Sequence, residues 1–253
     1  MGTYVITGSA TGIGGTIRER LSLQGHRVIG VDIKDADVIA DLSSDAGRAA
    51  AVAGVRSLAT DGLSGMITCA GLASHIEDHA LIASVNYFGS TVLVESLADL
   101  ISANNGSIVM IASNSAPMPT NDEYVRLLLE GDEMAARAKA NEISGHETYS
   151  GSKLAVSRWM RRNTKELAGR GIRINAVAPG YTETPMTKAV ADDPTYGDSI
   201  RQFVASIPMG RPGQPDDISN LVEFLLSDKA SFICGSVLFV DGGHDAMLRS
   251  DHF

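Results

Sequence analysis

The chain has 253 residues, of which 44% are apolar and 20% are charged, and its formal net charge at pH 7 is −9. This acidic balance argues against nucleic acid or an anionic membrane surface as a partner, because both attract clustered basic side chains. Two cysteines are too few for a disulfide framework, and the sequence shows no secretory leader and no apolar run as long as a membrane span. We therefore expect a reduced, cytoplasmic protein.

Short apolar, β-branched runs alternate with segments of helical spacing along the whole chain. The runs are bounded by Gly, Asp or Asn and are nearly continuous, which is typical of strands covered on both faces. We expect strands at Tyr4–Thr7, Arg27–Asp32, Gly65–Cys69, Ser107–Ala112, Ile172–Ala178 and Val237–Asp241. We expect helices at Ile13–Gln24, Leu81–Ala103, Tyr149–Ala168 and Asp216–Leu226. This alternation predicts a single α/β domain over residues 1–253, with a doubly wound parallel sheet of about seven strands and helices on both faces.

Two stretches interrupt this alternation, and both follow strands at their C-terminal ends, where ligands bind in open α/β sheets. The first, at about 116–147, reads as an insertion with one or two amphipathic helices over Glu123–Ala140. The second, at about 184–213, reads as a mobile substrate lid. We expect Pro117, Met118 and Met186 to contact the substrate. The lid also carries the apolar residues Val190, Tyr196, Ile200, Phe203 and Met209.

A glycine-rich turn, TGSATGIG at residues 7–14, follows the first strand. Gly8 permits a tight turn, Gly12 lets the backbone approach a diphosphate, and Gly14 lets the next helix pack closely on the sheet. The N-terminus of that helix presents free N–H groups and the positive end of its dipole. The sequence therefore predicts a Rossmann fold in which Gly8, Thr11, Gly12, Ile13 and Gly14 bind a dinucleotide.

Asp32 ends the second predicted strand, about 20 residues beyond the glycine turn. Its carboxylate can accept hydrogen bonds from the adenosine ribose and would repel a 2′-phosphate. No arginine adjoins it, and Lys34 is two residues further on, so we favour NAD over NADP. The alternative is that Asp32 only ends the strand. Asp41-Leu42 follows a short apolar run and could cradle the edge of the adenine.

Tyr149 and Lys153, in the segment YSGSK, are one helical turn apart, which alone describes ordinary neighbours on a helix surface. Together with other segments in the same order, however, this pair resembles the short-chain dehydrogenase/reductase family over the whole chain. The matching segments are TGSATGIG at 7–14, Asp41-Leu42, CAG at 69–71, SVNYFG with Asn86, IVMIAS ending at Ser113, YSGSK at 149–153, and APG at 178–180 with Thr184 beyond. One departure is Thr68-Cys69, where the family usually has two asparagines.

A narrower resemblance, to the bacterial hydroxysteroid dehydrogenase/carbonyl reductase branch of this family, also covers the whole chain. It rests on the segments VDIKDADVIADLS, SVNYFG, APGYTETP, DPTYGDSI and VDGGHDAM. It predicts the fold and the chemistry more closely than it predicts the substrate.

The family resemblance implies a role for each catalytic position. Tyr149 is expected to exchange the proton of the substrate hydroxyl, with the charge of Lys153 lowering the pKa of its phenol. Lys153 would also bind the nicotinamide ribose. Ser113 is expected to hold the substrate oxygen, although a serine at a strand end can equally cap the backbone, and Ser115 is a competitor for the role. Asn86 is assigned to a water-linked proton relay; stabilising a helix kink is an alternative compatible with it.

The same resemblance places further segments around the cofactor. Cys69, Ala70 and Gly71 would form the turn beside the dinucleotide, and Pro179-Gly180 would turn the chain under the nicotinamide. The backbone of Thr182 and the hydroxyl of Thr184 would bind the carboxamide, unless these residues only form a polar turn. We expect no metal, because the six histidines show no ligand spacing.

These observations favour an NAD-dependent oxidoreductase that interconverts hydrophobic secondary alcohols, steroids among them, and their ketones. A ketoreductase for carrier-bound acyl chains is an alternative, although it would usually call for NADP and a basic surface. A dinucleotide-sensing regulator without activity is a third.

We expect a homodimer or homotetramer. Because the insertion would obstruct the Tyr149 helix that commonly pairs in this family, we expect subunits to join through the last strand and the Asp216–Leu226 helix.

Overall fold

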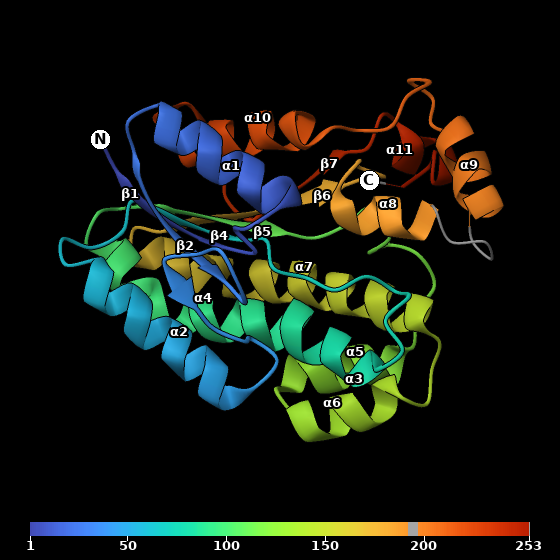
Figure 1. Cartoon of the computed structure of the whole chain (residues 1–253), viewed down its shortest axis with the longest axis horizontal. Coiled ribbons are helices and arrows are strands. Elements are labelled where there is room, and N and C mark those ends of the chain that lie inside the picture. The colour runs from blue at the N-terminus through green and yellow to red at the C-terminus, as the bar shows by residue number, and fades with distance from the viewer. Residues whose placement is uncertain (192–196, 253) are drawn as a thin grey trace.

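The computed structural model describes residues 1–191 and 197–252 as three layers, with a parallel sheet between two sets of helices (Figure 1). Within those residues the sheet has seven strands in the order β3-β2-β1-β4-β5-β6-β7. The strands are β1 (Thr3–Thr7), β2 (Arg27–Asp32), β3 (Val38–Ile39), β4 (Gly65–Thr68), β5 (Ser107–Ile111), β6 (Arg173–Pro179) and β7 (Val237–Val240). The order reverses between β1 and β4, which confirms the doubly wound sheet and places a ligand crevice at that point.

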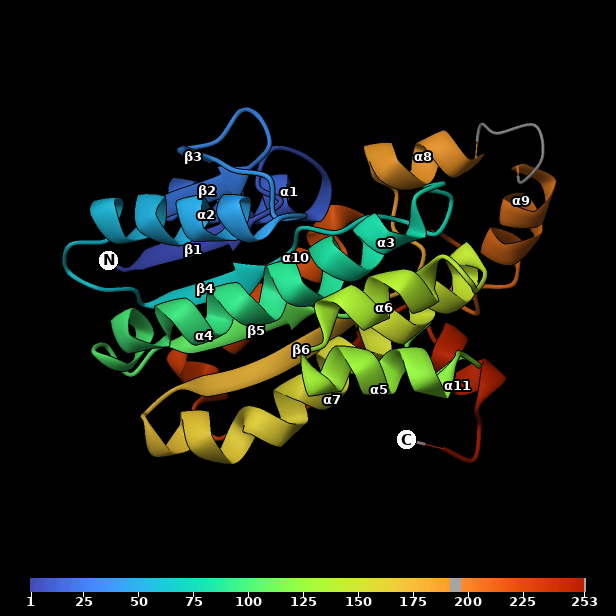
Figure 2. The same ribbon diagram turned by 90° about the horizontal axis from the view of Figure 1, so that it is seen from below.

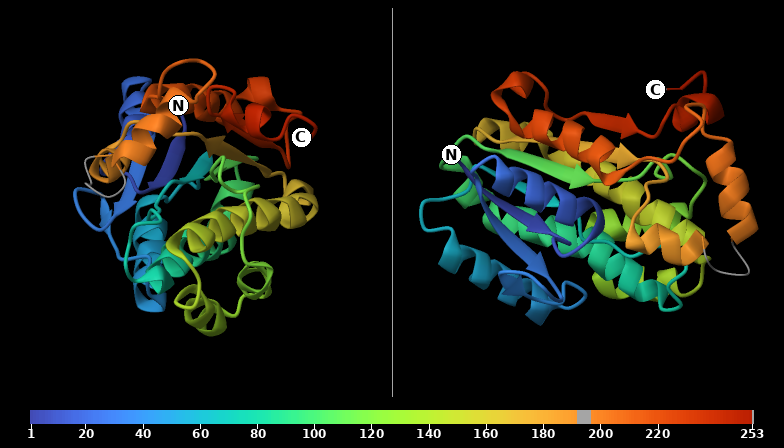
Figure 3. Two further views of the ribbon diagram at one scale, coloured as in Figure 1. Left: turned by 90° about the vertical axis from the view of Figure 1, so that its right-hand side faces the viewer. Right: turned by 45° about the horizontal axis from the view of Figure 1, so that its top comes forward.

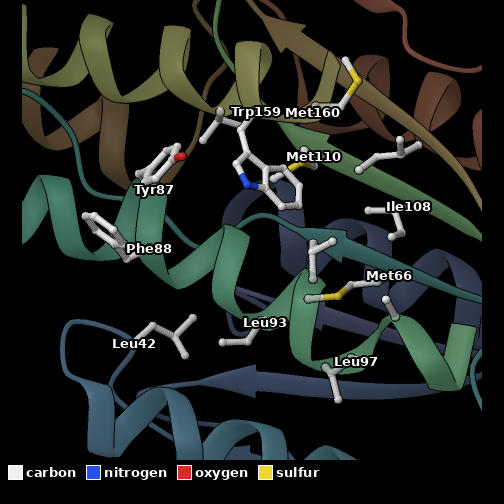
Figure 4. Packing of buried hydrophobic residues seen from close by; sticks show 14 of the residues in the cluster. Leu42, Met66, Tyr87, Phe88, Leu93, Leu97, Ile108, Met110, Trp159 and Met160 are labelled. Carbon is white, nitrogen blue, oxygen red and sulfur yellow. The ribbon is translucent and has the colours of Figure 1, made fainter. Parts of the chain in front are cut away.

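Helices cover both faces of the sheet because the strands are apolar on both sides. One face is covered by α1 (Gly12–Leu23) and α10 (Pro215–Leu226), which pack against each other (Figure 1). The other is covered by α2 (Asp45–Leu58), α4 (Gly89–Ser102) and α7 (Gly145–Gly169). Figure 4 shows the core on this second face, where Met66 and Ile108 of the sheet meet Leu93 and Trp159 of the helices.

The helix expected at Leu81–Ala103 is longer and less regular. It begins as α3 (His79–Ile82), widens into a π-helical segment, η1 (Ala83–Phe88), and continues as α4. The stretch His79–Ser102 is long and apolar enough to span a membrane by length and composition, so the statement that no run reaches that length is wrong. Most of this stretch is buried inside the protein, however, as is typical of a core helix.

The insertion forms two short helices, α5 (Asp122–Glu130) and α6 (Glu133–Ala140), which lie beside α7 and α3 on the side facing the viewer in Figure 2. Asn121 caps the start of α5, and Gly131, with φ 79°, ends it. Tyr124 of α5 is fully buried against α7, where a Cβ on Gly151 would come within 2.8 Å of the tyrosine ring. The absent side chain at Gly151 therefore allows α5 to approach α7 closely.

The C-terminal third surrounds the end of the sheet at which the strands finish (Figure 3). After β6 come α8 (Pro185–Ala191) and α9 (Gly197–Ala205), at the same end of the molecule as α11 (His244–Leu248). A 3-10 turn, η2 (Asp228–Ala230), connects α10 to the last strand. Of the lid residues named above, Tyr196 and the side chain of Val190 lie outside the described residues.

Candidate active site

A cavity of about 600 Å³ opens at the C-terminal ends of the strands, on both sides of the point where the strand order reverses. It is lined by every residue expected to bind the cofactor, from Gly8 to Thr184 along the sequence. Ser113, Tyr149, Lys153 and Met186 line it as well. The fold thus brings segments that are distant in sequence around one space.

The glycine turn leaves open backbone beside the cavity. Gly8 and Gly12 have φ of 69° and 58°, a left-handed conformation that favours glycine. A Cβ on Gly8 would lie 2.7 Å from the amide nitrogen of Ala70, and one on Gly14 would lie 2.2 Å from the carbonyl oxygen of Gly8. The Thr7 hydroxyl accepts hydrogen bonds from the amides of Cys69 and Ala70, both at 3.1 Å, and so joins the turns after β1 and β4.

The end of the cavity expected to hold the adenosine, called the adenosine end below, is lined by two carboxylates. Asp32 accepts hydrogen bonds from the amides of Ala10 (3.0 Å) and Ile33 (2.7 Å), which fix its orientation toward the glycine turn. Asp41 accepts one from the amide of Ser43 at 2.9 Å, and the Ser43 hydrogen bonds hold the pKa of Asp41 below its usual value. Open backbone next to a fixed carboxylate fits a dinucleotide with a free ribose hydroxyl. Lys34 also lines this end.

The side chains that the sequence predicts to be catalytic meet at the other end. Tyr149 and Lys153 share a face of α7, with the Lys153 Nζ 6.0 Å from the centroid of the tyrosine ring. Lys153 is only 5% exposed, and its Nζ donates a 2.9 Å hydrogen bond to the carbonyl oxygen of Ile111. Ser113, which follows β5, lies near the Tyr149 phenol and lowers its pKa. A hydroxyl pair beside a buried ammonium can hold a carbonyl oxygen and exchange a proton with it.

Ser115 supports Ser113. Its amide and its hydroxyl both donate to the Ser113 Oγ, at 3.1 and 3.0 Å. Because these two bonds use the acceptor capacity of Ser113, the hydrogen of the Ser113 hydroxyl remains available to Tyr149 or a substrate oxygen. Of the two serines, only Ser113 lines the cavity.

The pKa of Tyr149 differs from the sequence-based expectation. Burial of the phenol raises its pKa above the usual value, and the hydrogen bond from Ser113 offsets part of this rise. Burial lowers the pKa of Lys153 to about 8, with the Cys69 thiol opposing the shift. The expected lowering of the Tyr149 pKa is therefore not seen in the protein without a ligand, because burial is the largest cause of the shift.

Asn86 lies in the π-helical segment and is completely buried. Its Oδ1 accepts from the amide of Leu72 at 2.7 Å, and its Nδ2 donates to the Leu72 carbonyl and to the Ser152 hydroxyl, both at 3.1 Å. These bonds tie the widened helix to the turn after β4 and to α7, as the kink alternative requires. Asn86 does not itself line the cavity, and its role in a proton relay remains a prediction.

The segment after β6 is organised by a residue that the sequence analysis did not name. The Thr187 hydroxyl donates to the carbonyl oxygen of Thr182 at 2.6 Å and accepts from the amide of Thr184 at 2.9 Å. Thr182 in turn donates to the carbonyl oxygen of Gly180 at 3.1 Å. The i, i+3 spacing of Thr184 and Thr187 at a helix start could have indicated this local cap.

The apolar wall differs in part from the sequence-based expectation. Leu81 and Val85, an i, i+4 pair on α3 and η1, line the cavity, and their spacing was available in the sequence. Pro117 and Met118 lie outside its lining, because the chain after Ser115 turns away toward α5. Within residues 1–191 and 197–252, no cluster of three His, Cys, Asp or Glu could hold a metal ion.

Comparison with known proteins agrees with this arrangement. Over its full length the chain is 39% identical to the 3-alpha-hydroxysteroid dehydrogenase/carbonyl reductase of Comamonas testosteroni, and the match covers all of both proteins. The chain belongs to the short-chain dehydrogenase/reductase family. It is therefore an oxidoreductase, built on the family's Rossmann fold.

Other family members match at different levels. The structure of a 3-alpha-hydroxysteroid dehydrogenase from Pseudomonas sp. B-0831 complexed with NADH superimposes with a TM-score of 0.95 at 44% identity, covering 99% of this chain and 100% of that one. The 3-oxoacyl-[acyl-carrier-protein] reductase of Escherichia coli (strain K12) is 28% identical over 94% of this chain and 95% of its own length. The family model described as enoyl-(acyl carrier protein) reductase matches residues 133–245.

Proposed function

We propose that this protein is an NAD-dependent dehydrogenase/reductase that interconverts a hydrophobic secondary alcohol and its ketone. The observation that carries the proposal is the convergence of Ser113, Tyr149 and Lys153 on the cavity that also holds the glycine turn and Asp32. Relatives named for hydroxysteroid and carbonyl substrates match the whole chain, and one was solved with NADH.

Each of these residues has a defined task in the proposed reaction. The cofactor, when bound, supplies or accepts the hydride. The Ser113 hydroxyl donates a hydrogen bond to the substrate oxygen, and Tyr149 gives that oxygen a proton in reduction or takes one in oxidation. Lys153, with a pKa of about 8, is mostly charged at neutral pH and favours the phenolate that oxidation requires.

The substrate class follows from the wall on the catalytic side. Leu81, Val85, Ile111 and Met186 line the cavity there and would exclude water from an alicyclic or aromatic ring. Sugars and charged acids would leave their polar groups unpaired against this surface. A bulky apolar alcohol is therefore favoured.

The proposal is tested by following NADH formation with a panel of cyclic alcohols that includes steroids, monoterpenols and aryl carbinols, with NADP⁺ in parallel. We expect turnover of at least one bulky apolar alcohol, with NAD⁺ preferred. Turnover only of a β-ketoacyl thioester with NADPH would support the acyl-carrier alternative that the 28% identical relative represents. Binding of NADH without turnover of any substrate would support the regulator.

We propose further that the protein is a cytoplasmic homo-oligomer joined through β7 and α10. β7 is at the edge of the sheet, and Phe224 of α10 and Phe232 are 38% and 102% exposed. α5 packs against α7, which obstructs pairing of α7 helices between subunits. Light scattering after gel filtration would test this, since a Phe232→Asp variant should dissociate. An assembly that is unchanged in that variant would count against the proposed interface.

A further inference from the structure

The insertion has a contact with the cofactor side of the molecule that its position in the sequence does not suggest. Arg48 of α2 is 2% exposed, and its guanidinium meets Glu133, the first residue of α6, through two hydrogen bonds. The two residues are 85 positions apart in the sequence. Asp45 also contacts this guanidinium, but its side chain is 96% exposed, so Glu133 is the less hydrated partner of the buried charge.

The same guanidinium also contacts the loop that lines the adenosine end of the cavity. Arg48 Nη1 donates a 3.1 Å hydrogen bond to the carbonyl oxygen of Leu42. Leu42 and Asp41 both line the cavity. One guanidinium therefore bridges the carboxylate of the insertion and the backbone of the loop at the adenosine end.

The rest of this loop is closely packed. A Cβ on Gly47 would lie 1.8 Å from the Asp41 carbonyl oxygen, and one on Gly89 would lie 3.1 Å from the Leu42 Cβ. The Leu42 side chain is buried in the core beside Leu93 (Figure 4). Side-chain packing thus fixes one side of the loop, while Arg48 holds its carbonyl group.

We propose that Glu133 and Arg48 are positioning residues for the adenosine half of the cofactor, so that the insertion supports cofactor binding. Glu133 compensates the buried charge of Arg48 and orients its guanidinium, and Arg48 holds the Leu42 backbone where the adenine edge would rest. Without Glu133 the guanidinium would turn toward the exposed Asp45 and solvent, since a buried unpaired charge is costly. This inference rests on the proposed dinucleotide function.

A second contact shows that α6 is anchored on both sides of the binding region. Arg137, one turn further along α6, donates a 2.7 Å hydrogen bond to the hydroxyl of Ser84 in the π-helical segment. This bond does not involve Glu133, so loss of the Glu133 carboxylate removes the charge contact while Arg137 still ties α6 to the π-helical segment.

The test is isothermal titration of Glu133→Gln and of the unaltered protein with NADH, ADP-ribose and nicotinamide mononucleotide. ADP-ribose contains the adenosine half of the cofactor, whereas nicotinamide mononucleotide lacks it. We expect Glu133→Gln to raise the Kd for NADH and ADP-ribose about tenfold, the effect of 1.4 kcal/mol. The Kd for nicotinamide mononucleotide should stay within twofold, and kcat with saturating cofactor should not change.

Glu123→Gln is the matched control. Glu123 lies in the same insertion and forms an ion pair with Lys139 at 2.9 Å, but its side chain is 55% exposed and faces solvent. The same loss of one carboxylate should leave all three Kd values unchanged. If Glu133→Gln does not fold, the Arg48→Met/Glu133→Leu variant removes both charges together and should bind ADP-ribose with the same tenfold loss.

The outcomes separate this inference from the proposed function. Equal affinities of Glu133→Gln and the unaltered protein for ADP-ribose would overturn the inference alone. Equal weakening of ADP-ribose and nicotinamide mononucleotide would also overturn it, since it would indicate general damage. Failure of the unaltered protein to bind NADH or ADP-ribose would overturn the proposed function.

Discussion

The two ends of the cavity are built in different ways. At the adenosine end, glycine backbone, the ends of β1 and β2, and a loop closely packed between Gly47 and Gly89 surround the space. At the substrate end the outer wall is α8, where Met186 is 42% exposed. Main-chain geometry therefore determines what the adenosine end can bind. At the substrate end, a few exposed side chains determine which ligand can bind. The groups expected to be catalytic lie at this second end, on α7 and just after β5.

The largest expected effect is at Tyr149. Tyr149→Phe removes the proton carrier and should lower kcat about 10³-fold, within the range for general acid–base groups. The Kd for NADH should stay within twofold, because the aromatic ring is retained. Steady-state kinetics and titration with NADH measure the two quantities. Undiminished turnover would show that another group carries the proton.

Ser113→Ala should lower kcat about 10²-fold, because one hydrogen-bond donor to the reacting oxygen is lost. Ser115→Ala is the comparison, because it removes the side-chain donor to Ser113 but leaves the donor amide. The decrease in kcat should therefore be smaller than in Ser113→Ala. A larger decrease in kcat in Ser115→Ala than in Ser113→Ala would make Ser115, and not Ser113, the donor to the substrate oxygen.

At the adenosine end, Asp32→Ala should raise the ratio of kcat/KM with NADP⁺ to that with NAD⁺ about tenfold, since a carboxylate no longer faces the 2′-phosphate. Most of the change should appear in KM. An unchanged ratio would mean that Asp32 only ends β2, and that another group, such as Lys34, governs the choice of cofactor.

The shifted pKa of Lys153 gives a stability prediction. Its pKa is about 8 in the folded protein and about 10.4 in the unfolded chain, so the unfolded state binds more protons between these values. The free energy of unfolding should therefore gain about 1–3 kcal/mol from this residue as pH rises from 8 to 10. Urea unfolding of Lys153→Met should lack this gain. The same pH dependence in both proteins would contradict the burial of the charged amine.

The smallest expected effect is at the contact between the insertion and α7. The Tyr124 hydroxyl is buried without a hydrogen-bond partner among the described residues, so Tyr124→Phe should leave stability unchanged or raise it by up to about 1 kcal/mol. Thermal unfolding measures this change. Clear destabilisation would reveal a partner for the hydroxyl.

The residues assigned to the adenosine end come together in one cavity, because the glycines and strand-end carboxylates that mark it follow from local backbone conformation. Gly8, Gly12 and Asp32 could be assigned a role before any fold was known, and the cavity collects all of them. The sheet was predictable for the same reason, since β-branched runs alternate with helices. β3 is only two residues long, and its short apolar run was noted but not assigned as a strand.

The substrate end could not be predicted to the same degree. Pro117 and Met118 were assigned to the substrate because the insertion begins beside the expected substrate site. They do not line this cavity, and their contact with a substrate stays a prediction. The pKa of Tyr149 depends on burial, which sequence spacing does not show. The contact of Arg48 with Glu133 joins two charged residues that would each be taken for surface positions in the sequence.

A crystal structure with NADH and an unreactive ketone analogue tests the arrangement most directly. We expect the nicotinamide between Thr184 and the pair of Ser113 and Tyr149, with the Tyr149 hydroxyl at about 2.6–3.2 Å from the analogue oxygen. A nicotinamide bound elsewhere, or a Tyr149 hydroxyl turned away from the analogue, would contradict the catalytic assignment.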